Sequence, residues 1–89
     1  MKAVITVVGK DTLGIVAKVS TECFEYGANI VDITQKVMRE YFTMILLVEL
    51  DSLKTSFSDF ADALANKGSE MGLEIKVMHE DIFNSMHRI

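Results

Sequence analysis

The chain has 89 residues, of which 49% are hydrophobic and 25% are charged, a balance typical of one small globular domain with a single core. Its net charge of −4, without any basic run that could hold a phosphate backbone or an anionic lipid, argues against direct binding of nucleic acid or a membrane. One cysteine, no signal-peptide pattern and no apolar run of the roughly 20 residues that span a bilayer together predict a cytoplasmic protein.

The first half of the chain predicts a strand, a helix and a second strand. Residues 3–8 (AVITVV) are apolar and β-branched, as in a buried strand. Residues 13–26 carry apolar side chains at helical spacing, with Asp11 or Thr12 available as the N-cap. The expected apolar positions of this helix are Val16, Val19, Cys23 and Phe24. Residues 29–38 alternate apolar and polar side chains, which predicts an edge strand with one buried face.

The second half predicts two further strands with a helix between them. Residues 41–50 (YFTMILLVEL) are apolar on both faces, which indicates a central strand that forms a hairpin with the strand before it. Residues 57–71 have a helical apolar stripe, and Ser56 with Asp59 forms a capping pair at its start. Residues 73–79 alternate again and predict a second edge strand.

The predicted element order is therefore β-α-β-β-α-β. Right-handed crossovers, with the first and third strands inside, give a ferredoxin-like α+β sandwich whose antiparallel four-stranded sheet has the order 4-1-3-2 and both helices on one face. This domain would span residues 1–79, and residues 80–89 would form a short amphipathic helix. Since that helix is too short to be stable alone, we expect it to pack on the domain or on a second copy, because the helix-free sheet face is otherwise exposed.

The segment with the most chemical information is residues 7–16 (VVGKDTLGIV), where a strand runs through two glycines into the start of a helix. The first turn of a helix has unpaired N–H groups and a partial positive charge, so such a place can receive a carboxylate. A plain strand-to-helix turn has the same pattern, and no Lys-Ser or Lys-Thr follows to make a P-loop. Taken alone, the segment leaves both interpretations open.

Together with the predicted β-α-β-β-α-β order, two short motifs resemble the signature of the ACT domain family. Residues 9–16 (GKDTLGIV) match its G-x-D-x-x-G-I-V/L loop, and residues 26–30 (YGANI) match the G-x-N-I that ends its first helix. Residues 35–44 (QKVMREYFTM) and 79–83 (HEDIF) are similar to small stand-alone bacterial ACT proteins, a group that also resembles the ACT halves of glycine-cleavage repressor proteins. The resemblance covers residues 1–79.

The resemblance implies a regulatory module that binds a small-molecule ligand, an amino acid, at the junction of a homodimer, often with the two sheets side by side. The residues that it carries over to ligand binding are Lys10, Asp11, Leu13, Gly14 and Ile15 in the loop, with Asn29 and Ile30 at the start of the second strand. Leu13 stands where many family members have proline, which makes the loop less rigid. The Asn29 amide could bridge the ligand or simply cap its strand, and both roles remain open.

Catalytic chemistry is not favoured by these residues. Cys23 lies on an apolar helical stripe, as an inert buried thiol does, and His79 and His87 fit structural or solvated roles better than a metal site with Glu80 and Asp81. We therefore expect no enzyme activity, no metal and no cofactor. A second function class remains: a protein–protein interaction module without a ligand, whose edge strand or tail docks a protein partner.

Overall fold

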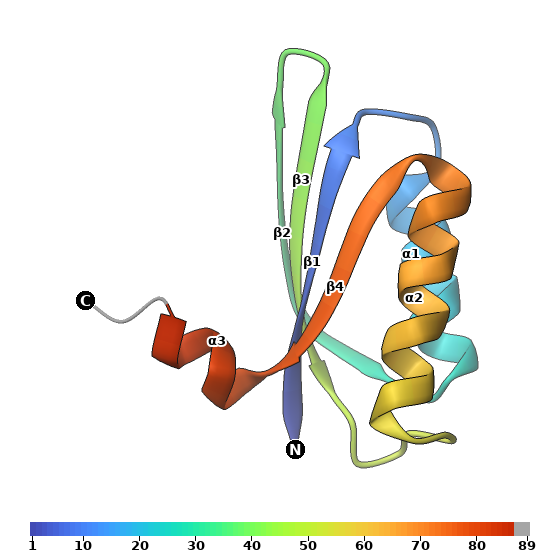
Figure 1. Cartoon of the computed structure of the whole chain (residues 1–89), viewed down its shortest axis with the longest axis vertical. Coiled ribbons are helices and arrows are strands. Elements are labelled where there is room, and N and C mark those ends of the chain that lie inside the picture. Colours follow the sequence, from blue (N-terminus) through green and yellow to red (C-terminus); the bar gives the residue numbers. More distant parts are fainter. Residues whose placement is uncertain (87–89) are drawn as a thin grey trace.

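A computed structural model of the chain describes residues 1–86. Its elements are β1 (Lys2–Lys10), α1 (Ile15–Glu25), β2 (Asn29–Met38), β3 (Tyr41–Glu49), α2 (Phe57–Met71), β4 (Leu73–His79) and α3 (Glu80–Met86). All strand pairs are antiparallel and the sheet order is β2-β3-β1-β4, which confirms the predicted 4-1-3-2 order and the ferredoxin-like α+β class. Helices α1 and α2 cover one face of the sheet, while α3 lies on the other side (Figure 1). The expected tail helix ends here at Met86, and residues 87–89 lie outside the described chain.

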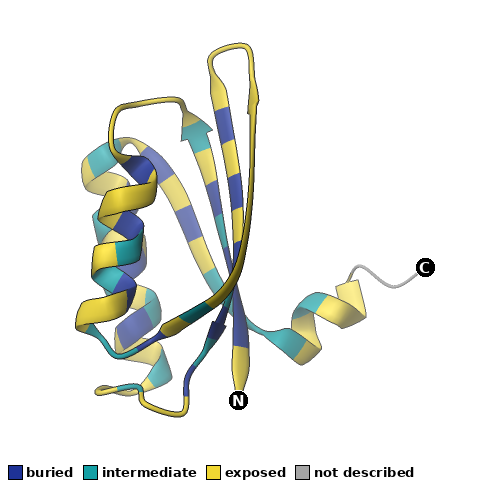
Figure 2. Cartoon of the chain, turned by 180° about the vertical axis from the view of Figure 1, so that it is seen from behind, coloured by how far each residue is buried: buried dark blue, intermediate teal, exposed yellow. Residues whose placement is uncertain are grey.

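The hydrophobic core lies between the sheet and the two long helices (Figure 2). Alternate strand residues point into it because side chains in a strand have a period of two. Its strand members are Ala3, Ile5, Val7, Phe42, Met44, Leu46, Val48, Leu73 and Ile75, and its helical members are Ile15, Val19, Cys23, Phe60 and Leu64. The helical members recur every four residues, so each helix contacts the sheet along one stripe.

Helix α2 begins and ends as its sequence predicts. The Ser56 hydroxyl accepts a hydrogen bond from the backbone N–H of Asp59 (3.1 Å), which confirms the predicted cap. Gly72 ends the helix with φ 73°, and its N–H donates to the carbonyl of Ser69 (3.3 Å). Both termini are therefore satisfied by local groups.

Helix α1 differs from its prediction at both its start and its apolar face. It begins at Ile15 after Gly14 (φ 80°), with no side-chain cap, so the predicted cap by Asp11 or Thr12 was wrong. The chain turns at glycine, and neither of those side chains bonds the first turn of the helix. The buried stripe contains neither Val16 nor Phe24, and Phe24 is 80% exposed. The apolar periodicity predicted the helix correctly, but Val16 and Phe24 lie on its exposed side and not on its buried side.

Strand β2 is exposed along almost its whole length, although one buried face was predicted. Ile33 and Val37 do lie on the helix-side face, since they pair with the buried Leu46 and Phe42 of β3. No helix of this copy reaches over them, however, and Val37 is 53% exposed. A bulge between Ile30 and Asp32 leaves Val31 exposed as well. The predicted apolar face exists, but nothing within one copy covers it.

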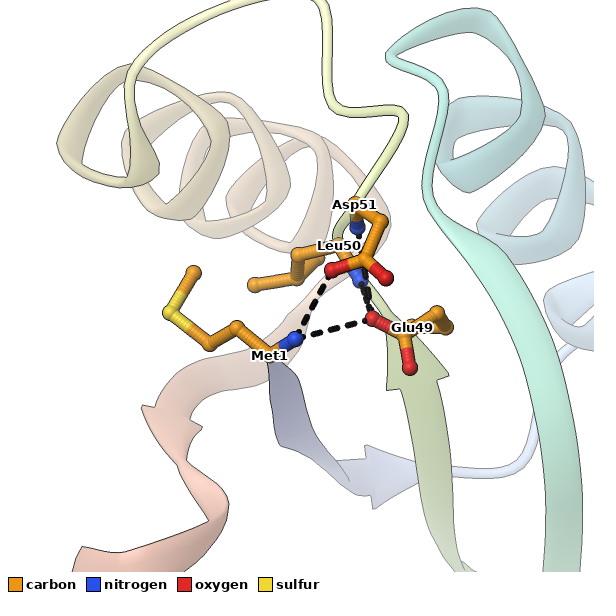
Figure 3. Close-up of polar contacts among 4 residues, drawn as sticks. All are labelled: Met1, Glu49, Leu50 and Asp51. Atoms are coloured by element: carbon orange, nitrogen blue, oxygen red, sulfur yellow. Dashed lines mark hydrogen bonds and ion pairs between the residues drawn. The ribbon is translucent and has the colours of Figure 1, made fainter.

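The first residue is tied to the end of β3 (Figure 3). The amino group of Met1 donates to Asp51 Oδ1 (2.8 Å) and Glu49 Oε1 (3.1 Å), and the backbone N–H of Leu50 donates to the Met1 carbonyl (2.8 Å). The hydrogen bond that this amino group donates to Asp51 is the main cause that raises its pKa, and the same bond lowers the pKa of Asp51. These contacts continue the pairing of β1 with β3 by one residue.

Candidate ligand-binding site

The loop between β1 and α1 is open to solvent and anchored by its backbone. The N–H of Asp11 donates to the carbonyl of Glu40 in the β2–β3 turn (2.7 Å), and the N–H of Lys18 donates to the carbonyl of Gly14 (3.0 Å). A Cβ added to Gly14 would meet only Lys18 Cε at 3.9 Å. Gly14 is therefore required by its positive φ, and the space around its backbone is free for a ligand to approach.

The five predicted loop residues do not offer the same groups to a ligand. Lys10 and Asp11 are exposed, and Leu13 is 93% exposed. Ile15 instead packs in the core, so only its backbone could contact a ligand. The loop thus presents one carboxylate, the backbone of Gly14 and an apolar side chain, whereas Lys10 pairs with Tyr41 and points to the sheet face away from the helices.

The other two predicted residues lie at the start of β2. Asn29 is exposed, whereas Ile30 is half-buried and packs against the core. Asn29 borders an open hollow of about 250 Å³. The hollow is lined by Phe24, Gly27, Ala28, Asn29, Ser52 and Lys54. Among these residues, Lys54, Asn29 and Ser52 carry an ammonium, an amide and a hydroxyl group, which are groups that suit a carboxylate.

Lys54 and Ser52 are residues of this hollow that the sequence analysis missed. The backbone N–H of Lys54 donates to the carbonyl of Tyr26 (2.9 Å), and a Cβ at Gly27 would collide with the carbonyl oxygen of Ser52. The loop after β3 therefore packs directly on the turn after α1. The only signal in the sequence is Gly27 itself, whose missing side chain allows the contact but does not name the partner segment.

The two groups of predicted residues do not meet within one copy. Lys10 pairs with Tyr41 at one end of β3, while Asn29 pairs with Glu49 at the other. Eight residues of strand separate these ends, a distance of about 26 Å at about 3.3 Å per residue. No small amino acid can contact both ends at once. If both motifs bind one ligand, the second motif must come from another copy.

An apolar surface borders the outer side of α1 and β2. Glu22 Oε1 lies 3.8 Å from Lys67 Nζ of α2, which identifies the side of α1 that faces α2. Successive residues of a helix are rotated by about 100° about its axis. The buried stripe with Cys23 therefore lies next to the side that faces α2. The stripe with Val16 and Phe24 lies one step further around the helix and faces away from α2. With the exposed β2 residues, this stripe forms what we call the edge surface. Its members are Leu13, Val16, Phe24, Val31, Ile33 and Val37.

Cys23 and His79 both pack against other side chains of the described chain. Burial raises the pKa of the Cys23 thiol to about 11, and the His79 ring stacks on Phe57 with 4.3 Å between ring centroids. Within residues 1–86, no group of three or more His, Cys, Asp and Glu is placed to hold a metal ion. Nor is any helix in that range long and apolar enough to cross a membrane. The polar groups at the two ends of α1 remain the candidate site.

Known proteins share this sequence and fold. The family model of the ACT domain matches residues 2–78. The chain belongs to the ACT domain family. A UPF0237 protein of Clostridium acetobutylicum is 49% identical over 89 residues, covering 100% of both chains. An ACT domain protein from Streptococcus pneumoniae has a TM-score of 0.82 with 44% identity over 98% of each chain. These matches confirm the resemblance drawn from the loop and Asn-Ile motifs.

A more distant structure confirms the second part of that resemblance. A putative glycine cleavage system transcriptional repressor matches with a TM-score of 0.70 and 26% identity. The match covers 85% of this chain and 43% of the repressor. The ACT domain is a regulatory module, and in the repressor it forms part of a larger protein.

Proposed function

We propose that the protein is a regulatory module that binds a small amino acid at the junction of a homodimer and passes its occupancy on to another protein. One observation carries this proposal: the two halves of the candidate site lie at opposite ends of one copy. A two-fold axis that pairs two copies antiparallel joins the loop of each copy to the Asn29 hollow of the other. Without the second copy, the site is incomplete.

The edge surface supplies the pairing. Strand β2 ends the sheet, and its outer backbone groups have no strand beside them in the described chain. Antiparallel pairing of β2 with the partner's β2 joins the two sheets and sets α1 beside the partner's α1, antiparallel to it. Phe24 of one copy then lies near the partner's Leu13, and the exposed apolar side chains of both copies become covered. This explains why β2 has an apolar face that its own helices leave bare.

The chemistry of the composite site suits a free amino acid. Lys54 offers an ammonium group to the ligand carboxylate, and the partner's Asp11 offers a carboxylate to the ligand ammonium. Asn29 can bond either group, and the bare backbone of Gly14 lets the ligand approach closely. The open space at Gly14 leaves room for a small side chain. In this account the site binds and orients its ligand and performs no reaction.

Thermal unfolding against each common amino acid at millimolar concentration tests this proposal. We expect one or two of them to raise Tm, since a ligand at about 100 times its Kd stabilises a protein by about 2.7 kcal/mol. Asn29→Ala and Gly14→Ala should abolish the ligand-induced rise. Asn66→Ala, on the exposed face of α2, and Gly72→Ala, which has the same positive φ as Gly14, are the matched controls and should retain it. A Tm that no amino acid changes would count against a ligand.

The exposed edge of β2 also supports a second candidate function, a protein–protein interaction module without a ligand. A strand of ten residues with one free edge can accept a strand from another protein. The mass of the purified chain separates the two candidates. A chain that stays monomeric and is stabilised by no amino acid favours the interaction module, whereas a dimer with a ligand-induced rise in Tm favours the sensor.

A further inference from the structure

Helix α3 contacts β1 and β4 of its own copy at its start and extends outward from there. It projects from the end of β4 on the side of the sheet opposite α1 and α2 (Figure 1). None of its residues is buried, and Ile82 and Met86 are 51% and 64% exposed. A helix of seven residues is not stable in water on its own. Its apolar side chains therefore need a surface that covers them.

A matching apolar surface lies at the far end of the sheet, on the same side as α3. We call the sheet face opposite α1 and α2 the open face. Directly paired strand residues share a face, so the pairs of Lys10 and Met38 with Tyr41 place these three together on it. The pairs of Val8 and Lys36 with Thr43 place these on it one step along. The hairpin end of the open face thus includes the exposed residues Val8, Lys10, Lys36, Met38 and Tyr41, together with Thr43 and Glu74, which both pair with Val8.

The charges of these two surfaces are complementary. Helix α3 begins with Glu80 and Asp81, and at the same end of the sheet Glu49 pairs with Lys2 on the open face. The hairpin end instead carries the ammonium groups of Lys10 and Lys36, and neither forms an ion pair with another described residue. The carboxylate of Glu74, which pairs with Val8 on the same face, lies 3.1 Å from Lys76 Nζ. An acidic, apolar helix and a basic, apolar sheet end therefore occur in the same chain.

One copy cannot join these two surfaces to each other. His79, which precedes α3, pairs with Ala3 at the start of β1, whereas Lys10 is at its end. The seven residues from Ala3 to Lys10 extend over about 23 Å at about 3.3 Å per residue. Helix α3 also points away from the sheet and does not run along it (Figure 1). The hairpin end can therefore cover α3 only if it belongs to a second copy.

We propose that α3 of one copy docks on the hairpin end of the open face of a second copy, and that the contact is reciprocal. A two-fold axis that is perpendicular to the strands and parallel to the sheets stacks the open faces of the two copies on each other, with their strands antiparallel. Each α3 then meets the partner's hairpin end. Ile82 and Met86 then cover Val8, Met38 and Tyr41, and Asp81 faces the partner's Lys36. The open face and the edge surface are different parts of the molecule, so this contact is independent of the ligand-binding dimer and joins two such dimers.

Charge reversal with mixing tests the contact. The mass of the full chain is measured by sedimentation equilibrium for the unmodified protein, for Asp81→Lys and for Lys36→Glu. We expect each variant to have half the mass of the unmodified assembly, because each places like charges opposite one another. An equimolar mixture of the two variants should recover the full mass, since both contacts between unlike variants again pair opposite charges. Asp62→Lys and Lys18→Glu, on the exposed sides of α2 and α1, are the matched controls and should keep it.

Two results would overturn the inference. Either an unchanged mass in both variants, or two halved masses that mixing does not restore, would show that α3 and Lys36 do not meet between copies. Met86→Glu gives a second reading at an exposed position and should also halve the mass. Circular dichroism of each variant confirms that it is folded. Amino-acid binding is measured on the same samples, so failure of this contact is distinguishable from failure of the proposed function.

Discussion

Single residues at the end of β3 show how local charge adds to this fold. The amino group of Met1 bonds Asp51 and Glu49 at the surface (Figure 3). The raised pKa of the amino group means that its contribution to stability is complete below about pH 8 and is lost as pH rises through the folded pKa. The lowered pKa of Asp51 means that its contribution is complete above about pH 4 and is lost as pH falls through the folded pKa.

These two directions define a pH window in which the contact stabilises the fold. We predict that Asp51→Asn lowers Tm slightly at about pH 6. The difference should shrink as pH falls through the lowered pKa of Asp51 and as pH rises through the raised pKa of the amino group. The effect should be small because both groups are exposed and screened by solvent. Thermal unfolding across this range checks the prediction, with Asp62→Asn as the control for loss of an exposed carboxylate. A Tm difference that does not change with pH would contradict it.

At the scale of the elements, Gly27 controls how α1 is joined to β2 and to the loop after β3. Gly27 and Gly72 both have positive φ after a helix, but only Gly27 lies against another segment, at the Ser52 carbonyl and at Lys54 Cγ (3.2 Å). Nothing lies within 4 Å of a Cβ at Gly72. These two glycines therefore separate backbone strain from steric collision.

We predict that Gly72→Ala destabilises the fold by about 1–2 kcal/mol, the cost of a left-handed non-glycine residue. Gly27→Ala should cost about 1–3 kcal/mol more, because the added Cβ pushes the Ser52 loop away. Urea unfolding measures both losses: the free energy of unfolding of each variant follows from its midpoint urea concentration and its slope m, and the slopes are compared between variants. Equal losses at the two positions would show that the Gly27 turn and the Ser52 loop are not in close contact.

The elements also show what the sequence could and could not predict. Strand and helix order followed from periodicity, because burial between two layers dictates periods of two and 3.6 in any chain. The residue at which α1 begins could not be predicted in this way, because Gly14 and not a polar side chain precedes the helix. Val16 and Phe24 were assigned to the buried face because apolar spacing cannot distinguish a side chain covered by its own chain from one left for a second copy.

For the molecule as a whole, the candidate site could be predicted only in pieces. The loop and Asn29 were found from two short motifs, but their separation along the sheet depends on the direction of α1 and β2, which the motifs do not contain. Lys54 joined the site through the close packing on Gly27. If both motifs bind one ligand, each ligand site is shared between two copies.

The most direct test is to mix two variants, each lacking one half of the site. Asp11→Ala and Asn29→Ala are co-refolded in equal amounts, and binding of the most stabilising amino acid is measured by calorimetry. Neither variant alone should bind. Random pairing makes half of the dimers mixed, and each mixed dimer has one of its two sites intact, so the account predicts about one quarter of the unmodified binding capacity. A mixture of folded dimers that binds no ligand would contradict a shared site.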